Sequence, residues 1–419
     1  MNAATPPVRR AAVVFIFFTM VMDVLGFGII IPVLPKLVEQ FMGGDAAAGA
    51  RMYGWFGTLW WLMQFLFAPL VGVISDRFGR RPVILISCFG LGVDYVVMAL
   101  APNVAWLLAG RIVSGICTSS FSASGAYIAD VSPPEKRAAA FGMMGAAFGI
   151  GFVVGPGIGG LLGGIDPRLP FWGAAGLALL GGLYGLFILP ESLPAERRDT
   201  FSWNKANPVG SLKLLRSHPD LLGLSAIYFL FQAAHNVLPN MFVIYTGYRY
   251  GWDAKVTGLA LMTTGIYSII VQGGLVKPAV KYLGEHRALY VGLVFGVLGF
   301  AGFAIAPSAF WIWATQPVFA LMGLFGPGIQ SLMSKRVAPY EQGKLQGANM
   351  AVSAIGGMMA PLVFTGAFAW CIDRSHGWTL PGAPFFIAAG LLLIALLLAL
   401  RFARKPESAP AAAAPEAAP

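Results

Sequence analysis

Apolar residues along this chain of 419 residues fall into twelve long runs that are separated by short polar segments. Each run is long enough to cross the hydrocarbon core of a bilayer, which takes about 20 apolar residues in a helix. The predicted spans lie near residues 11–37, 52–74, 83–101, 104–126, 138–162, 169–190, 221–245, 256–279, 287–306, 309–333, 345–371 and 380–401. The pattern therefore predicts an all-α membrane protein with twelve transmembrane helices.

The longest polar break, from Glu191 to Asp220, separates the first six spans from the last six. The two sets align at one constant offset, at which Gly79 meets Gly284 and Pro156 meets Pro361. Such a repeat indicates two related six-helix halves around a central substrate path. We predict an N-terminal half at residues 1–190, a cytoplasmic linker at 191–220, a C-terminal half at 221–401 and a disordered tail at 402–419.

Basic residues are concentrated on one side of the predicted spans and orient the chain. Both termini and alternate loops hold most of the 28 lysine and arginine residues, whereas the opposite loops hold Lys36, Arg51, Arg168, Arg249, Lys255 and Arg374. The positive-inside rule then places both termini and the linker in the cytoplasm. We expect a multi-pass protein of a bacterial-type inner membrane.

Composition agrees with this pattern and narrows the class of protein. The chain is 57% hydrophobic and only 11% charged, so lipid rather than water is its main solvent. The net charge of +10 comes from short loops without basic tracts and interleaved aromatics, so we expect no nucleic-acid partner. The three cysteines have no paired spacing, and no metal site is expected.

Few ionisable side chains lie inside the predicted spans, and each is expensive in hydrocarbon. Asp23, Asp94 and Arg111 are therefore candidates for proton or substrate coupling, and His235 is a further candidate because it titrates near physiological pH. At 1.5 Å per residue, Asp94 and Arg111 lie at similar depth on adjacent helices and could pair. A static structural pair, or simple hydrogen bonding by Asp23 and His235, is the alternative.

Two segments place glycines at a distinctive spacing, one among charged residues and one around a proline. The loop after the second span combines a turn with a carboxylate among guanidinium groups, in Gly72, Asp76, Arg77, Gly79, Arg80 and Arg81. We expect Asp76 to latch onto the helix N-terminus near Lys344 in the other half, unless the loop is only an ordinary basic loop. The fifth span places small residues at helix-packing intervals around a proline, in Gly151, Gly155, Pro156, Gly159 and Gly160.

Uncharged polar residues inside the spans are candidates for lining a cavity. The residues expected there are Gln64, Gln232, Asn236, Gln272 and Gln316.

The loop at residues 72–82 resembles the signature of the major facilitator superfamily, and the fifth-span pattern resembles the motif of its antiporters. Further segments resemble the tetracycline-efflux branch of drug:proton antiporters, at residues 23–28, 32–35, 91–95, 111–115, 250–252 and 342–347. The resemblance implies export, with Asp23, Asp94 and Arg111 handling substrate and protons. One departure leaves the substrate open: Gly296 stands where that branch carries an acidic residue.

Together these features predict proton-coupled export of a small organic compound, with tetracycline-like antibiotics as one possibility. No phosphate-binding G-x-x-x-x-G-K-[ST] sequence occurs, so the proton gradient is the expected energy source and no cofactor is expected. We expect a monomer whose partners are substrate, protons and lipid. Proton-linked uptake of a metabolite is the alternative, and a membrane-embedded enzyme or receptor is a more remote one.

Overall fold

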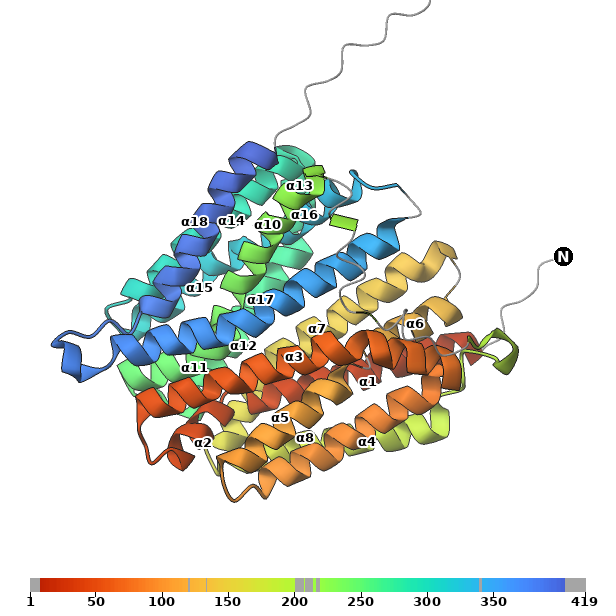
Figure 1. The fold of residues 1–419 in the computed structure, drawn as a ribbon, viewed down its shortest axis with the longest axis horizontal. Helices are drawn as coiled ribbons and strands as arrows, with labels where there is room; N and C mark the ends of the chain where they lie inside the picture. Colours follow the sequence, from red (N-terminus) through yellow and green to blue (C-terminus); the bar gives the residue numbers. More distant parts are fainter. Residues whose placement is uncertain are drawn as a thin grey trace, which may run out of the picture.

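The computed structural model describes residues 8–119, 121–132, 134–199, 207, 214–215, 219–338 and 341–403. Within these ranges every regular element is a helix, and 11 of the helices are long and apolar enough to span a bilayer (Figure 1). A bent pair at the N-terminal end supplies a twelfth span when it is counted as one. The predicted all-α, twelve-span architecture is confirmed.

The first six spans are built from α1 to α8. They comprise α1 (Val8–Ile30), α2 (Leu34–Phe41), α3 (Ala46–Phe78), α4 (Arg80–Ala99), α5 (Val104–Thr118), α6 (Phe121–Val131), α7 (Pro134–Gly163) and α8 (Leu169–Ile188), followed by the short η1 (Ala195–Arg197). Helices α1 and α2 meet at an angle of 41°. The predicted first span is thus broken, because Pro32 and Pro35 lack the amide hydrogens that continue a helix.

The second set of spans contains more interrupted helices. It comprises α10 (Pro219–His235), α11 (Val237–Tyr250), α12 (Ala254–Ile270), η3 (Val271–Leu275), α13 (Val276–Leu283), α14 (Glu285–Ile305), α15 (Ala309–Ala320), η4 (Leu321–Leu324), α16 (Phe325–Ser334), α17 (Gln342–Cys371), η6 (Arg374–His376) and α18 (Ala383–Phe402). The segment η3 is a π-helix inside a span. Residues 200–206, 208–213 and 216–218 of the predicted linker, and 404–419 of the predicted tail, lie outside the described residues.

Matched turns in the two halves support the internal repeat. Gly79 joins α3 to α4 with a φ of 104°, and Gly284 joins α13 to α14 with a φ of 79°. Side chains disfavour these backbone angles, so glycine is required for a tight turn at both places. The alignment of Gly79 with Gly284 therefore reflects the same structural need in both halves.

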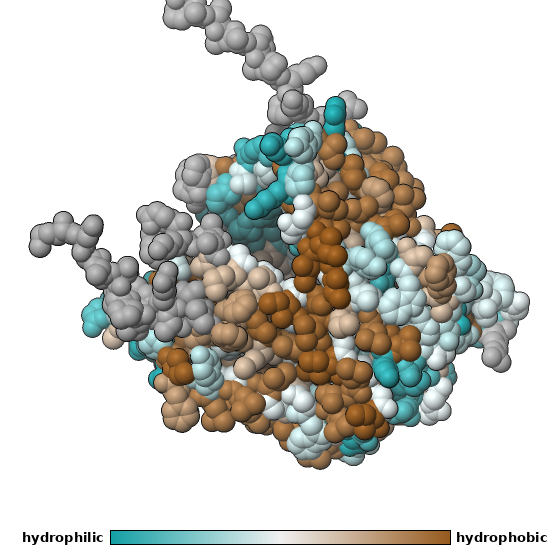
Figure 2. Space-filling model, turned by 180° about the vertical axis from the view of Figure 1, so that it is seen from behind, coloured by the Kyte–Doolittle hydropathy of each residue, from teal (hydrophilic) through white to brown (hydrophobic). Residues whose placement is uncertain are grey.

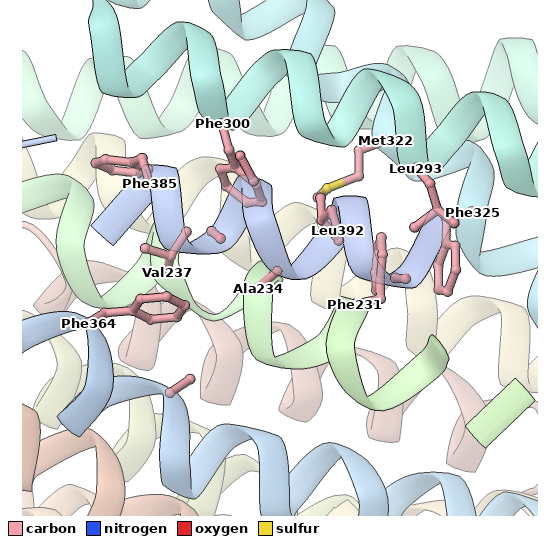
Figure 3. Packing of buried hydrophobic residues seen from close by; sticks show 14 of the residues in the cluster. Phe231, Ala234, Val237, Leu293, Phe300, Met322, Phe325, Phe364, Phe385 and Leu392 are labelled. Atoms are coloured by element: carbon pink, nitrogen blue, oxygen red, sulfur yellow. The ribbon is translucent and has the colours of Figure 1, made fainter. Parts of the chain in front are cut away.

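The outer surface is largely apolar, as a lipid-facing surface must be. Figure 2 shows hydrophobic side chains spread over much of one face. Inside the second half, Phe300, Phe325 and Phe385 are fully buried in a core formed by several helices (Figure 3). Apolar packing thus holds each half together, while further apolar residues face the bilayer.

The two halves touch mainly along two helix pairs, α3 with α17 and α7 with α12 (Figure 1), and α11 adds smaller contacts with α2 and α3. We call the end of the molecule that holds Gly79 and Gly284 the linker end, and the opposite end the far end. Towards the far end the backbones meet closely: a Cβ on Gly160 would lie 3.0 Å from the Cα of Gly258. Towards the linker end, Gly142 and Gly145 have no neighbour within 4 Å of such a Cβ. The halves are closed at the far end and separated at the linker end.

Candidate functional site: a cavity between the two halves

A cavity of about 540 Å³ lies between the halves. Its walls come from α1, α3, α4, α5, α6 and α7 on one side and from α10, α11, α12, η3 and α15 on the other. Small-molecule sites in proteins occupy roughly 300 to 1,000 Å³ and are mostly apolar with a few polar groups. The size of this cavity suits an organic compound of drug size.

The first-half wall is rich in aromatic rings. Phe27 of α1 and Trp60 of α3 stack with their centroids 5.1 Å apart, and Trp61 meets Trp60 edge to face. Tyr53, Phe56, Tyr95, Phe148 and Phe152 also line this wall. The wall therefore offers a large apolar surface on which a flat ring system can stack.

Arg111 is the one guanidinium of the described lining. Its central carbon lies 5.6 Å from the Phe27 ring centroid and 5.5 Å from that of Trp60. The side chain is 7% exposed, and its Nε is buried without a hydrogen-bond partner. The ring faces thus hold the cation in place without neutralising it.

The predicted pairing of Asp94 with Arg111 is not formed in this conformation. Among the described residues the two make no ion pair within 4.0 Å, and Oδ2 of Asp94 is buried without a partner. Sequence spacing placed both residues at similar depth, but it gave no view of side-chain direction. Arg111 turns instead towards Phe27 and Trp60, whose rings compete with Asp94 for it.

Asp23 lines the cavity from the middle of α1. Its carboxylate makes no hydrogen bond and no ion pair with the described residues. Phe27 lies one turn further along the same helix, about 6 Å away along the axis. An unpaired carboxylate in an apolar cavity is available to a proton or to a cationic group.

The second-half wall is polar but carries no carboxylate or ammonium among its described residues. Gln232 donates to Ser353 at 3.0 Å, and Ser353 donates to Tyr228 at 3.1 Å. His235 lines the cavity and stacks on Phe231 at 6.0 Å. This wall supplies hydrogen bonds rather than charge.

The polar residues predicted to line the cavity divide into two groups. Gln232, Asn236 and Gln272 line it, whereas Gln64 and Gln316 do not. Gln316 is fully buried, where its amide donates to the Ala260 carbonyl and accepts from Thr263. A buried amide needs hydrogen-bond partners, and Gln316 finds them on the neighbouring helix. Its two hydrogen bonds therefore connect α15 to α12.

The fifth-span motif lies where α7 contacts both halves. Gly151, Gly155 and Gly159 face α1, where a Cβ on Gly155 would lie 2.7 Å from the Cα of Gly28. Gly160 faces α12 of the other half, and Pro156 lines the cavity between these two contacts. Small residues are needed on both sides because the backbones approach to direct contact.

The loop at residues 72–82 is held within the first half in this conformation. Asp76 pairs with Arg80 at 2.6 Å, and Arg80 also reaches Asp130 at 3.3 Å. Glu191 accepts from the amides of Arg80 and Arg81, at 2.9 and 3.3 Å. The predicted contact of Asp76 with the helix end near Lys344 is not formed here, because the halves are separated at the linker end. Asp76 pairs with Arg80 instead.

Gly296, where the resemblance leads one to expect an acid, is buried away from the cavity. A Cβ there would lie 2.6 Å from Leu392 and 3.0 Å from Met322, whose side chains meet in Figure 3.

The residues described contain no group of three or more His, Cys, Asp or Glu side chains placed to hold a metal ion. The charge of the cavity therefore rests on Asp23 and Arg111.

Sequence reasoning missed Glu191 because it was assigned to the linker. It also gave no role to the contact of Arg111 with Phe27 and Trp60, which lie on three different helices. Asn240 lines the cavity as well. Its spacing of four residues from Asn236, one helical turn, was the available signal for it.

A cavity between two six-span halves, closed at one end and separated at the other, is the architecture of a membrane transporter. The family description "Major Facilitator Superfamily" matches residues 16–361. The chain belongs to the major facilitator superfamily.

Curated relatives include two tetracycline resistance proteins of Escherichia coli. Class C is 37% identical over 92% of this chain and 95% of the relative, and class E is 35% identical over 93% and 94%. Among solved structures, a D-xylose–proton symporter has a TM-score of 0.75 at 16% identity over 93% of this chain and 97% of its own. The human organic anion transporter MFSD10 (TETRAN) has a TM-score of 0.70 at 24% identity, over 94% and 100%. At these identities, the solved structures support the fold.

Proposed function

We propose that this protein exports a small organic compound from the cytoplasm in exchange for protons. The observation that carries the proposal is Asp23, a carboxylate at the cavity wall without a partner among the described residues. A proton and a cationic group of the substrate compete for such a carboxylate. Competition for one site is the simplest way to couple two opposite flows.

The names of the relatives support the direction and the kind of cargo. Six curated relatives, the tetracycline resistance proteins of classes C, E, G, D, B and H, are 28% to 37% identical to this chain. Resistance by a transporter requires movement of the drug out of the cell. Export by secondary active transport is therefore favoured over uptake of a metabolite.

Alternating access follows from the two helix pairs between the halves. In this conformation the cavity is closed at the far end, and we assign the linker end to the cytoplasm from the distribution of basic residues. Rocking of the halves would close the linker end and open the far end. Asp76, now paired with Arg80, would be free in that second state to reach α17.

Everted membrane vesicles that contain the full chain test this function. We expect tetracycline, or another compound of a susceptibility panel, to accumulate in the vesicle lumen on energisation and to leave on addition of a protonophore. Accumulation that a protonophore leaves unchanged would contradict proton coupling. Energised movement in the opposite direction would support uptake instead.

A further inference from the structure

Side-chain amides follow one another at intervals of one helical turn along the second-half wall, at Gln232, Asn236 and Asn240. The amide nitrogen of Asn236 donates to the backbone carbonyl of Gln232, and that of Asn240 donates to the carbonyl of Asn236, both at 2.8 Å. A carbonyl only accepts, so each side chain must turn its nitrogen to it and its oxygen away. The oxygen of Asn240 lies against the opposite wall, where a Cβ on Gly57 would come within 2.7 Å of it. The oxygen of Asn236 accepts no hydrogen bond from the described residues and is left for the cavity.

Gln232 presents its oxygen in the same way. Its amide nitrogen donates to Ser353 at 3.0 Å, and Ser353 donates its hydroxyl hydrogen to Tyr228 at 3.1 Å. A serine hydroxyl has a single hydrogen, so Ser353 has none left to give to Gln232. The Gln232 oxygen therefore remains for the cavity, and Asn236 follows one helical turn, or about 6 Å, further along.

Two hydroxyl groups of α12 also face the cavity without a free hydrogen. Thr264 donates to the carbonyl of Ala260 at 2.9 Å, and Ser268 donates to the carbonyl of Thr264 at 3.0 Å. Both residues line the cavity, and they are one helical turn apart. Because each hydroxyl has donated its only hydrogen to the helix backbone, its oxygen can only accept from a ligand.

Open acceptors therefore outnumber open donors on this wall. Two amide oxygens and two hydroxyl oxygens have free lone pairs, whereas each of the two amides keeps only one further N–H. Apart from Asn240, the other polar side chains of the described lining on this side, His235 and Gln272, offer donors and acceptors alike. An acceptor that loses water without gaining a donor is costly, so a ligand that brings hydrogens is favoured over one that brings only oxygens.

We propose that the second-half wall selects substrates by their hydrogen-bond donors, and that it binds compounds with two or more neutral hydroxyl or N–H groups along one edge. Gln232 and Asn236 accept from that edge on one side, and Thr264 and Ser268 accept from it on α12. The aromatic first-half wall holds the apolar face of the same compound. A compound whose hydroxyls are all capped as ethers brings acceptors to acceptors and binds weakly. These four residues therefore determine specificity.

This inference deepens the proposed export function by naming the class of compound, and it rests on that function for the direction of movement. Selection of donors is a separate task from proton exchange. The four accepting side chains are neutral and lie on the second-half wall, whereas Asp23 lies on the first-half wall. A binding measurement without a proton gradient therefore tests the selection by itself.

Three forms of one flat scaffold test the donor requirement by isothermal titration calorimetry on the purified full chain, with the heat of empty detergent micelles subtracted. The probes are quercetin, which has five hydroxyls, its pentamethyl ether and unsubstituted flavone, in mildly acidic buffer that keeps the hydroxyls neutral. We expect quercetin to bind about tenfold or more tightly than either other probe, since each neutral hydrogen bond contributes a factor of roughly 2 to 10. Exclusion by size would weaken the ether alone. Flavone that binds as tightly as quercetin, or no saturable binding of quercetin, would overturn the proposal.

Variants assign the preference to the wall. The double variant T264V/S268A removes two acceptors with little change of shape, and we expect it to reduce the preference for quercetin over flavone about fourfold or more. T246V is the matched control, because Thr246 also donates to the carbonyl four residues earlier, at 2.8 Å from Phe242, but lies outside the cavity lining. We expect T246V to keep the full preference. A T264V/S268A protein with the same preference as T246V would refute the role of the α12 hydroxyls, and N236L tests the amide row by the same measurement.

The vesicle experiment separates this inference from the proposed function. Donor-selective binding without energised movement of any compound would refute export and leave the donor-selective wall standing. Energised export together with equal binding of quercetin and flavone would refute the donor-selective wall and leave export standing.

Discussion

The hydroxyl of Thr58 donates a hydrogen bond of 2.7 Å to the carbonyl oxygen of Met358, across the boundary between the two halves. The bond joins α3 to α17, where Gly57 and Pro361 also bring the backbones together. Pro361 has no amide hydrogen, so the carbonyl of Gly357, the residue before Met358, lacks its usual helical partner. Thr58 is therefore placed to stabilise closure of the far end.

Replacement of Thr58 should shift the balance between the two conformations. T58V keeps the shape of the side chain but loses the bond, which contributes about 0.5 to 1.5 kcal/mol. We expect the far-open state to become roughly 2- to 10-fold more populated. The measurement is the rate at which a membrane-impermeant maleimide labels Gln272→Cys from the far face, in a chain whose three native cysteines are replaced.

T58S is the matched control because it retains the hydroxyl. We expect it to label at the rate of the parent chain. Equal rates for T58V and T58S would show that the bond does not contribute to closure.

Replacing Asp23 by a neutral residue should abolish transport and leave membrane insertion unchanged. D23N removes the carboxylate for which proton and substrate compete, so we expect loss of gradient-driven export with a normal amount of protein in the membrane. The control is E39Q, which removes a carboxylate from α2 outside the cavity lining. Full gradient-driven export by D23N in energised vesicles would refute the coupling role of Asp23.

Glu191 stabilises the start of α4 from the end of the sixth span. Its carboxylate accepts from the amides of Arg80, Arg81, Ser192 and Leu193 at 2.9 to 3.3 Å. Two of these donors, the amides of Arg80 and Arg81, are at the start of α4, where the carboxylate acts like an N-cap. We expect E191A to cost about 1 to 3 kcal/mol. Thermal unfolding in detergent measures the loss.

The control for Glu191 is E196Q, because Glu196 is an exposed acid in η1 a few residues away. We expect its unfolding temperature to match that of the parent. An E191A protein as stable as E196Q would show that water replaces the carboxylate at no cost.

Hydropathy was enough to predict the twelve spans, because the bilayer sets the length of every helix. It could not predict the break between Ile30 and Leu34 or the π-helical turn at Val271–Leu275, which depend on local backbone geometry. Ionisable side chains are rare inside membrane spans, and this was enough to choose Asp23, Asp94 and Arg111 as candidate functional residues. The direction of Arg111 towards Phe27 and Trp60 depends on packing between helices that are distant in sequence, and no pattern within one helix records it.

Restoring an acid at position 296 should destabilise the protein rather than extend its substrate range. A Cβ on Gly296 would already lie 2.6 Å from Leu392, and the position does not line the cavity. G296D would therefore bury an unpaired carboxylate in an apolar contact, at a cost of about 3 kcal/mol or more. G390A is the matched control, since a Cβ on Gly390 meets nothing within 4 Å. We expect G296D to unfold at lower temperature than G390A and to gain no tetracycline export. If G296D has normal stability and increased tetracycline export, position 296 faces the substrate in another conformation, and this prediction is wrong.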